Sequence, residues 1–299
     1  MIKSKTSLFA IALLAAVAIS ASQARAATYN AGDLIMGFRA TGGIGSSSNV
    51  LVDLGSAINF RDLGAANLIN ITSVGTDLDA TFGITAGNSV AWYDRTDLSF
   101  GVVGVYSSAS SGAVTSGDPV RTLYASQTRT AVGTVGSANS ATPGSPTAIS
   151  STNQGTSAGN MISLASTFTN QAASGNNTAV AITGAGTNTW TSFTSGTTDF
   201  AAFNPGVEQT FGNGTWSGGT YGSVTNVEGA VDLYRILNTT SGASPSGTAH
   251  VGTYDATIVI NQSGQISAVN AVPEPSTYAL FGLGAAAIVF AARRRQLKA

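Results

Sequence analysis

The sequence predicts a mainly β protein: sandwich-like antiparallel sheets with one or two short helices, preceded by a cleaved N-terminal signal helix and followed by a single C-terminal transmembrane helix. Three observations lead to this prediction. Short runs of β-branched and aromatic residues are separated by turn formers, and 36 of the 299 residues are glycine. An apolar segment lies near each end of the chain. Hydrophobic residues make up 43% of the chain, which supplies a core and excludes a disordered polymer.

The predicted strands are short and follow one another at intervals typical of all-β proteins. In chain order they are Leu34–Arg39, Asn49–Leu54, Leu68–Ser73, Ser89–Tyr93, Phe100–Tyr106, Arg121–Ala125, Ala179–Thr183, Val227–Leu237 and Tyr254–Ile260. In the second run, Val50, Val52 and Leu54 occupy alternate positions. This period of two is typical of a strand with two different faces.

Two helical segments interrupt the predicted strands. Asp77 is placed to cap a short turn over Leu78–Phe82, which Gly83 ends. The second segment, Ala158–Ala173, has apolar residues at helical spacing, namely Met161, Leu164, Ala165 and Phe168. Between residues 107 and 157 the chain is rich in Ser, Thr and Gly, which predicts a surface insertion or a linker. Whether the body is one domain or two stays open.

Residues 1–26 have the three parts of a secretory signal peptide. Two lysines form a basic start, and the apolar run Leu8–Ile19 follows. With 12 residues this run is short for a helix that crosses a membrane, which needs ~20 residues. Ala24 and Ala26 supply the small side chains that signal peptidase requires, so the mature protein is predicted to begin at Ala27.

A second apolar segment lies near the C-terminus, between a proline motif and a basic cluster. Pro273, Glu274 and Pro275 form an extended stretch, because neither proline fits inside a helix. Residues 278–292 are the predicted transmembrane helix, and three arginines follow it: Arg293, Arg294 and Arg295. Arginines beside a membrane helix stay in the cytoplasm. The body, 27–271, is therefore predicted to lie on the far, non-cytoplasmic side of the inner membrane.

This three-part tail, residues 272–299, resembles the PEP-CTERM sorting signal of Gram-negative bacteria that make exopolysaccharide. In that family an exosortase, a membrane-embedded cysteine transpeptidase, recognises the Pro-Glu-Pro motif, the helix and the arginine cluster. The resemblance implies transient anchoring in the inner membrane and delivery to the cell surface or the extracellular matrix. It implies nothing about the activity of the body. The alternative is an ordinary C-terminal anchor whose linker contains Pro-Glu-Pro.

Composition excludes several classes of site and partner. The chain has no Cys and one His, which excludes Cys/His zinc sites, thiol catalysis and a disulfide framework. The body contains six arginines, no lysine and thirteen acidic residues, so its net charge is −7. Such a surface repels phosphate, and no nucleic-acid partner is expected.

The sequence offers few residues for catalysis. A Ser-His-Asp hydrolase would have to use His250, but no Gly-x-Ser-x-Gly motif occurs. A glycosidase needs two carboxylates across a cleft, and Glu208 and Glu228 are the only glutamates of the body. We therefore expect no catalytic residue. The alternative is a secreted polysaccharide-active hydrolase that uses aspartate carboxylates.

Calcium is the one candidate cofactor. Asp77 with Asp79, and Asp94 with Asp97, are closely spaced carboxylates that could supply oxygen ligands. No EF-hand loop or acidic nonapeptide repeat accompanies them. Roles as a helix cap for Asp77 and as turn residues for Asp94 and Asp97 are therefore favoured over a metal site.

Aromatic residues offer the remaining hint of a ligand. Five of them would stack on sugar rings if one sheet face exposed them together: Trp92, Trp190, Trp216, Tyr93 and Tyr221. Core packing is the simpler explanation. Taken together, the sequence predicts an exported, non-enzymatic protein of the surface or matrix with a structural or adhesive role. Its expected partners are signal peptidase, exosortase, the inner membrane before processing, and exopolysaccharide.

Overall fold

The computed structural model describes residues 25–63, 68–108, 118–129, 151–173, 178–184, 186–195, 207–212, 216–237 and 252–269. The predicted signal helix with Ala24 lies outside these residues, and so does His250. The tail from residue 270 onward also lies outside them, with the proline motif, the predicted transmembrane helix and the arginine cluster. In the part of the chain that is described, no helix combines the length and the apolar character needed to span a membrane.

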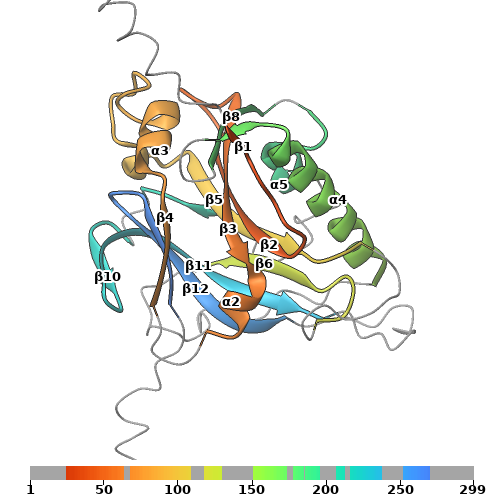
Figure 1. The fold of residues 1–299 in the computed structure, drawn as a ribbon. Helices are drawn as coiled ribbons and strands as arrows, with labels where there is room; N and C mark the ends of the chain where they lie inside the picture. The colour runs from red at the N-terminus through yellow and green to blue at the C-terminus, as the bar shows by residue number, and fades with distance from the viewer. Residues whose placement is uncertain are drawn as a thin grey trace, which may run out of the picture.

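All the described strands belong to one antiparallel sheet of 13 strands (Figure 1). They are β1 (Arg25–Ala26), β2 (Asp33–Ala40), β3 (Ser48–Ser56), β4 (Leu68–Ser73), β5 (Leu98–Val105), β6 (Leu123–Thr128), β7 (Ala172–Ala173), β8 (Thr178–Thr183), β9 (Gln209–Thr210), β10 (Gly219–Tyr221), β11 (Val224–Ile236), β12 (Thr253–Asn261) and β13 (Gln265–Val269). The order along the sheet is β1-β7-β8-β3-β2-β5-β6-β11-β12-β13-β4, while β9 pairs with β5 and β10 with β11. The mainly β, antiparallel prediction is confirmed.

The sheet curls until it is nearly closed, and this replaces the sandwich expected from the sequence (Figure 1). Two short helices bridge its ends. α2 (Ala57–Arg61) follows β3 and contacts β12, and α3 (Gly75–Phe82) follows the edge strand β4 and contacts β3 and β8. Buried side chains on the concave face, such as Phe38, Val52 and Ile258, form a single cluster. One curved sheet thus encloses a core that a sandwich would build from two sheets.

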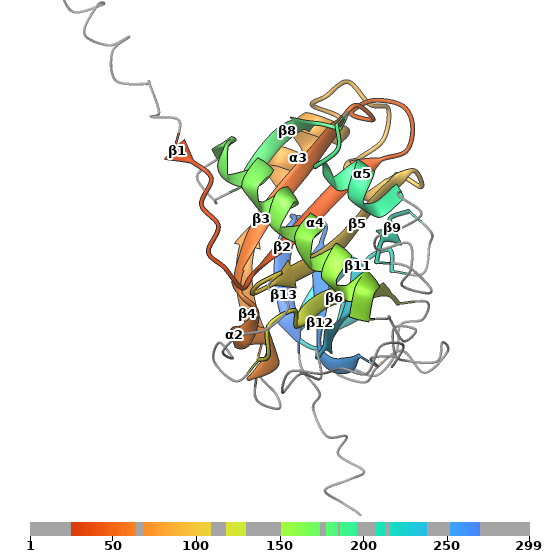
Figure 2. The same ribbon diagram turned by 90° about the vertical axis from the view of Figure 1, so that its right-hand side faces the viewer.

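Helices also cover the convex face of the sheet (Figure 2). α4 (Ser151–Thr169) contacts β5, and α5 (Trp190–Ser195) contacts β2 and β3. The four apolar residues predicted to line one face of α4 are all buried in a second cluster, which confirms their helical spacing. The helix boundaries differ from the prediction, because α4 begins at Ser151 and Ala172–Ala173 form strand β7.

Most predicted strands are present, but Ser89–Tyr93 is not a strand. This segment consists of bends and the 3-10 turn η1 (Trp92–Asp94). Val90 is 41% exposed, whereas Trp92 is buried in the core. The apolar residues of this segment therefore do not form one face of a sheet. The sequence analysis also missed β13, which pairs with β12 and β4.

The structure corrects the expected role of Asp77 and restricts the expected surface insertion. Asp77 lies in the first turn of α3 and is not its cap, because the capping position is Val74 and no side chain caps it. A carboxylate in the first turn still faces the positive end of the helix. Of the hydroxyl-rich segment 107–157, β6 lies in the sheet between β5 and β11, and thus belongs to the body.

Candidate functional site

A surface pocket of about 470 Å³ lies at one end of the sheet, beside α3. Its described lining comes from α3 and the loop after it, from η1, and from the β12–β13 turn: Gly75, Thr76, Asp79, Ala80, Ile84, Thr85, Ala91, Trp92, Tyr93, Gln262 and Ser263. This volume falls within the range of ~300–1,000 Å³ that is typical of small-molecule sites. The pocket is therefore the first candidate for a binding site.

Two glycines allow α3 to approach the β12–β13 turn closely. A Cβ on Gly75 would lie 2.2 Å from the carbonyl oxygen of Ser263, and a Cβ on Gly264 would lie 2.1 Å from the amide nitrogen of Gly75. Gly264 also has a φ of 75°, which disfavours other residues. This close approach brings Thr76 on the helix and Gln262 on the turn into the same pocket wall.

Asp79 shapes the loop that forms the pocket rim. Its Oδ1 accepts a hydrogen bond from the Ile84 amide at 2.9 Å, and its Oδ2 accepts one from the Thr85 amide at 3.3 Å. The Thr85 hydroxyl donates to the same Oδ2. Because the carboxylate is engaged by this loop, it serves as a structural acceptor. The loop presents Ile84 at the rim with 61% of its surface exposed.

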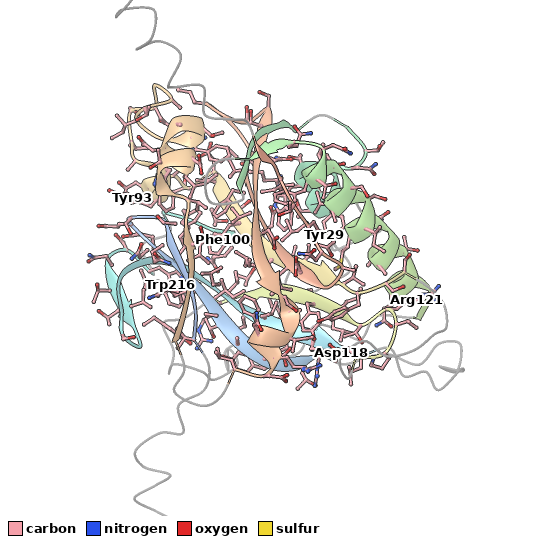
Figure 3. All side chains as sticks on the ribbon, in the orientation of Figure 1. Tyr29, Tyr93, Phe100, Asp118, Arg121 and Trp216 are labelled. Atoms are coloured by element: carbon pink, nitrogen blue, oxygen red, sulfur yellow. The ribbon has the colours of Figure 1, made fainter. Side chains whose placement is uncertain are left out.

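A half-buried tyrosine forms the aromatic wall of the pocket. The rings of Trp92 and Tyr93 meet edge to face, with 5.2 Å between their centroids and an interplanar angle of 85°. Trp92 is buried and meets Phe211 edge-on at 5.2 Å. The buried indole thus anchors η1 in the core and holds Tyr93 at the surface. Figure 3 shows Tyr93 beside α3, at the opposite end of the body from Asp118.

Arg95 joins the loops next to the pocket. It is buried, and its Nη1 donates to the carbonyl oxygens of Ile44 at 2.6 Å and Phe82 at 2.9 Å. Its Nη2 pairs with Asp97 Oδ2 at 2.8 Å, and this hydrogen bond lowers the pKa of the Asp97 carboxyl. The described lining itself contains no Lys, Arg or His. Its described residues therefore offer an anionic ligand no cation.

The predicted calcium residues do not converge on one centre. Asp79 lines the pocket and holds its loop, Asp97 is paired with Arg95, and Asp94 is exposed in η1. Asp77 lies on α3. Among the described residues, no group of three or more His, Cys, Asp or Glu side chains could hold a metal ion.

Of the five aromatic residues considered for sugar stacking, four are buried as core packing predicts, and Tyr93 is half-buried. Trp190 and Trp216 are 0% and 2% exposed, and Trp92 and Tyr221 are buried as well. The Trp190 indole donates to Glu208 Oε1 at 2.9 Å, and Glu208 also pairs with Arg39. The other glutamate, Glu228, is buried, which raises the pKa of its carboxyl. These contacts give both glutamates structural roles.

A second cluster of charged groups lies near α2. Asp118 Oδ1 pairs with Arg61 Nη1 at 3.2 Å and with Arg235 Nη1 at 3.3 Å, and the Tyr124 hydroxyl donates to its Oδ2. The Asp118 side chain is 0% exposed. Two guanidinium groups and a phenol thus surround one fully buried carboxylate, which keeps that carboxylate paired.

Asp255 belongs to the same cluster and sits in a β-bulge. Leu233 pairs with Ala256 and Tyr234 pairs with Tyr254, so Asp255 has no cross-strand partner on β11. Its side chain is buried, and its Oδ2 accepts no hydrogen bond from the described residues. Burial raises the pKa of Asp255 to about 7, while the nearby Arg235 opposes this shift.

The sequence analysis missed this cluster because its members lie far apart in the chain. Arg61 comes from α2, Asp118 precedes β6, and Arg235 and Asp255 lie on β11 and β12. Only 9% of residues are charged, and charged residues are rarely buried. A charged residue inside an apolar strand was therefore the one sequence feature that could have indicated this cluster. The pocket residues Thr76 and Gln262 carried no signal, since such residues are common throughout the chain.

The comparisons with known proteins identify the tail and leave the body open. The family model described as the PEP-CTERM protein-sorting motif matches residues 271–295, which include the proline motif and the arginine cluster. Searches of curated proteins and of solved structures found no match to the chain. The matched motif implies export and membrane-associated processing, and it is associated with exosortase. Residues 271–295 therefore carry a PEP-CTERM protein-sorting motif.

Proposed function

We propose that the body works outside the inner membrane, on the cell surface or in the exopolysaccharide matrix, as a non-enzymatic structural or adhesive protein. The observation that carries this proposal is the PEP-CTERM motif at residues 271–295. The motif directs the body to the cell surface or matrix, where a protein can attach the cell to its surroundings. The predicted signal peptide accounts for export.

The position of Val269, the last described residue, relative to the pocket supports an adhesive role. β13 begins next to the β12–β13 turn that lines the pocket and ends at Val269, so the chain leaves the described body at the far end of this strand. Five residues of strand span about 17 Å at ~3.3 Å per residue. A body attached through the end of β13 would therefore present the pocket away from the site of attachment.

The alternative is a secreted polysaccharide-active hydrolase, and one observation favours it. Asp118 is held by two arginines, whereas Asp255 has a pKa raised to about 7, and a carboxylate pair with such different environments is a familiar acid and base arrangement. Both side chains are buried, however, which leaves little access for a polymer. Hydrolysis of an exopolysaccharide that is lost in Asp255→Asn would favour this alternative.

The proposed function is tested by locating the protein in its host. A body-tagged protein is fractionated from cells with and without exosortase, and the intact mass of each fraction is measured. We expect a surface or matrix form that lacks the tail in cells with exosortase, and a membrane-bound form that keeps the tail in cells without it. Equal release of the same mass from both strains would contradict exosortase-dependent sorting.

A further inference from the structure

We infer that the pocket beside α3 is a binding site for a neutral saccharide. This inference deepens the proposed adhesive function by naming the chemical class of its ligand, and it rests on that function only for its biological meaning. The binding itself follows from three features of the pocket: its charge, its hydrogen-bonding groups and its aromatic wall.

The charge of the pocket argues for an uncharged ligand. The described lining contains one ionisable carboxylate, Asp79, and no basic side chain. Asp79 is engaged by the amides of Ile84 and Thr85 and by the Thr85 hydroxyl. A phosphate or a uronate would find no cation here, and a cation would find one carboxylate that is already hydrogen-bonded.

The hydrogen-bonding groups suit a ligand with many hydroxyls. Thr76, Gln262 and Ser263 come from two different segments and line the pocket. The Ser263 hydroxyl donates to Asn261 Oδ1 at 2.7 Å and keeps its acceptor capacity, and the Gln262 side chain is hydrogen-bonded to Glu228 and keeps its remaining polar group. Thr76 is exposed, so its hydroxyl is available to donate and to accept. Neutral hydroxyl and amide groups pair well with sugar hydroxyls, which also donate and accept. The glycine contacts between α3 and the turn fix the spacing of these groups before a ligand arrives.

Tyr93 supplies a flat apolar surface beside these polar groups. Its ring is half-buried and is held edge-on by Trp92, so little side-chain freedom remains to be lost on binding. A pyranose ring has an apolar C–H face and a polar rim, and an aromatic ring with neighbouring hydroxyls complements both. Ile84 extends the apolar surface at the rim. A peptide would not need this combination of one flat ring and several neutral hydroxyls.

Binding is tested with the full chain purified in a mild detergent and a panel of neutral oligosaccharides, namely cello-, xylo-, manno- and galacto-oligosaccharides. Isothermal titration and saturation-transfer difference NMR report affinity and the bound sugar protons. We expect at least one neutral series to bind at millimolar concentration or below. A charged series, such as oligogalacturonate, is expected to bind at least about tenfold more weakly, because the pocket offers no cation.

Matched variants locate the site. Tyr93→Ala removes the ring and should weaken binding by about tenfold or more, whereas Tyr93→Phe keeps the ring and should retain most of the affinity. Thr76→Ala should weaken binding by a smaller factor. Tyr29→Phe, a change at a half-buried tyrosine outside the described pocket lining, should leave affinity unchanged. Melting temperatures check that each variant is folded.

Three outcomes would overturn the inference: no binding by any neutral oligosaccharide, binding that Tyr93→Ala leaves intact, or binding of the charged series alone. Selective binding of peptides in place of saccharides would overturn it as well. None of these outcomes depends on sorting, so a protein that reaches the surface normally but binds no saccharide would refute this inference and leave the proposed localisation standing.

Discussion

Arg129 and Asp232 form a buried ion pair, with 2.6 Å between Nη1 and Oδ1 and each side chain only 1% exposed. Thr257 also donates to Asp232 Oδ1 at 2.7 Å, and the Arg129 guanidinium lies 5.3 Å from the centre of the Tyr221 ring. This network joins the C-terminal end of β6 to the convex side of β11 and β12. A buried charge without its partner is far more costly than the intact pair.

Replacing Arg129 with Met should therefore destabilise the protein by about 3–5 kcal/mol, because Asp232 loses its main countercharge in a buried site. Urea unfolding measures the change. The control is Asp62→Ala, which breaks a pair whose acidic side chain is 59% exposed and should cost less than ~1 kcal/mol. The double change Arg129→Met with Asp232→Leu should recover part of the loss. An equal loss in Arg129→Met and Asp62→Ala would contradict this account.

Asp255 should make the protein less stable as pH rises from about 4 to about 7. Its pKa in the folded state is raised to about 7 from the usual 3.8, so the folded protein retains a proton that the unfolded chain has already lost. Protonated Asp255 stabilises the folded protein fully below the pKa of the unfolded chain. This stabilisation is lost as pH rises through the pKa of the folded state. The nearby groups are Arg235, Asp118, Arg61 and Asp62, of which the two arginines oppose the shift.

Urea unfolding at pH 5 and pH 8 measures this effect. Asp255→Asn should flatten the profile and stabilise the protein at pH 8 by roughly 2–4 kcal/mol relative to the native chain, because the amide never ionises. Asp62 and Asp97 have lowered pKa values, so their stabilising effect is lost only below the chosen window. Asp97→Asn is the matched control and should leave the slope between pH 5 and pH 8 unchanged, because Asp97 is not among the groups that shift the pKa of Asp255.

The strands could be predicted well, because the alternation of apolar and polar residues that marks a strand lies within a few neighbouring positions. The alternation of Val50, Val52 and Leu54 reports which face of β3 meets the core, and the structure buries all three. The closure of the sheet could not be predicted in the same way. It depends on β4 pairing with β13, and Ser267 pairs there with Asn70 across almost two hundred positions. No short-range pattern encodes such a partner.

The candidate site was predictable only in part. The sequence drew attention to Tyr93 and Asp79, and both line the pocket. It gave the wrong setting for Tyr93, which was placed on a strand and lies in η1, and it named Asp79 only as a weak calcium candidate. The pocket arises where Gly75 meets Gly264, and two isolated glycines in a glycine-rich chain carry no visible signal. The sorting motif of the tail could be predicted, because its three parts lie in order along a short stretch, and the family model matches residues 271–295.

The predicted cleavage bond between Ala26 and Ala27 should resist signal peptidase once the body has folded. Arg25 and Ala26 pair with β7, the Ala27 amide donates to the Gln171 carbonyl oxygen at 2.9 Å, and Ala27 is 3% exposed. A protease needs an extended and accessible backbone. Removal of the signal should therefore precede folding of the body. It also removes β1, because Arg25 and Ala26 lie before the cleaved bond.

This order is measured by adding signal peptidase in detergent to the folded precursor and to the precursor freshly diluted from urea. We expect much faster cleavage of the diluted precursor and a product that begins at Ala27 by N-terminal sequencing. Equal cleavage rates would show that the edge opens freely, and a different first residue would displace the predicted site.

Calcium should have little effect on stability. Asp79 already accepts hydrogen bonds from Ile84 and Thr85, and Asp97 is paired with Arg95, so a metal ion would have to displace these contacts. Bound ligands raise the melting temperature by mass action. We expect a shift below about 1 °C at millimolar calcium, measured by differential scanning fluorimetry against magnesium. A larger rise that Asp79→Asn abolishes would restore the calcium hypothesis.

The last prediction concerns the sorting motif at residues 271–295. Replacing Pro273, Glu274 and Pro275 with alanines keeps the apolar segment 278–292, so membrane insertion should continue while tail removal and release fail. Replacing Arg293–Arg295 with alanines removes the charge that favours a cytoplasmic C-terminus, so this variant should insert with mixed topology.

The two variants separate recognition from anchoring, because each removes one part of the signal and keeps the other. Fractionation of a body-tagged protein measures release, and protease protection of intact cells measures topology. The triple-alanine variant at the proline motif should accumulate in the inner membrane with its body protected by the outer membrane, at the mass of the unprocessed chain. If this variant reaches the surface at the native level and loses its tail, the proline motif is not the element that the processing enzyme reads. The apolar segment would then act as a plain anchor that some other protease trims.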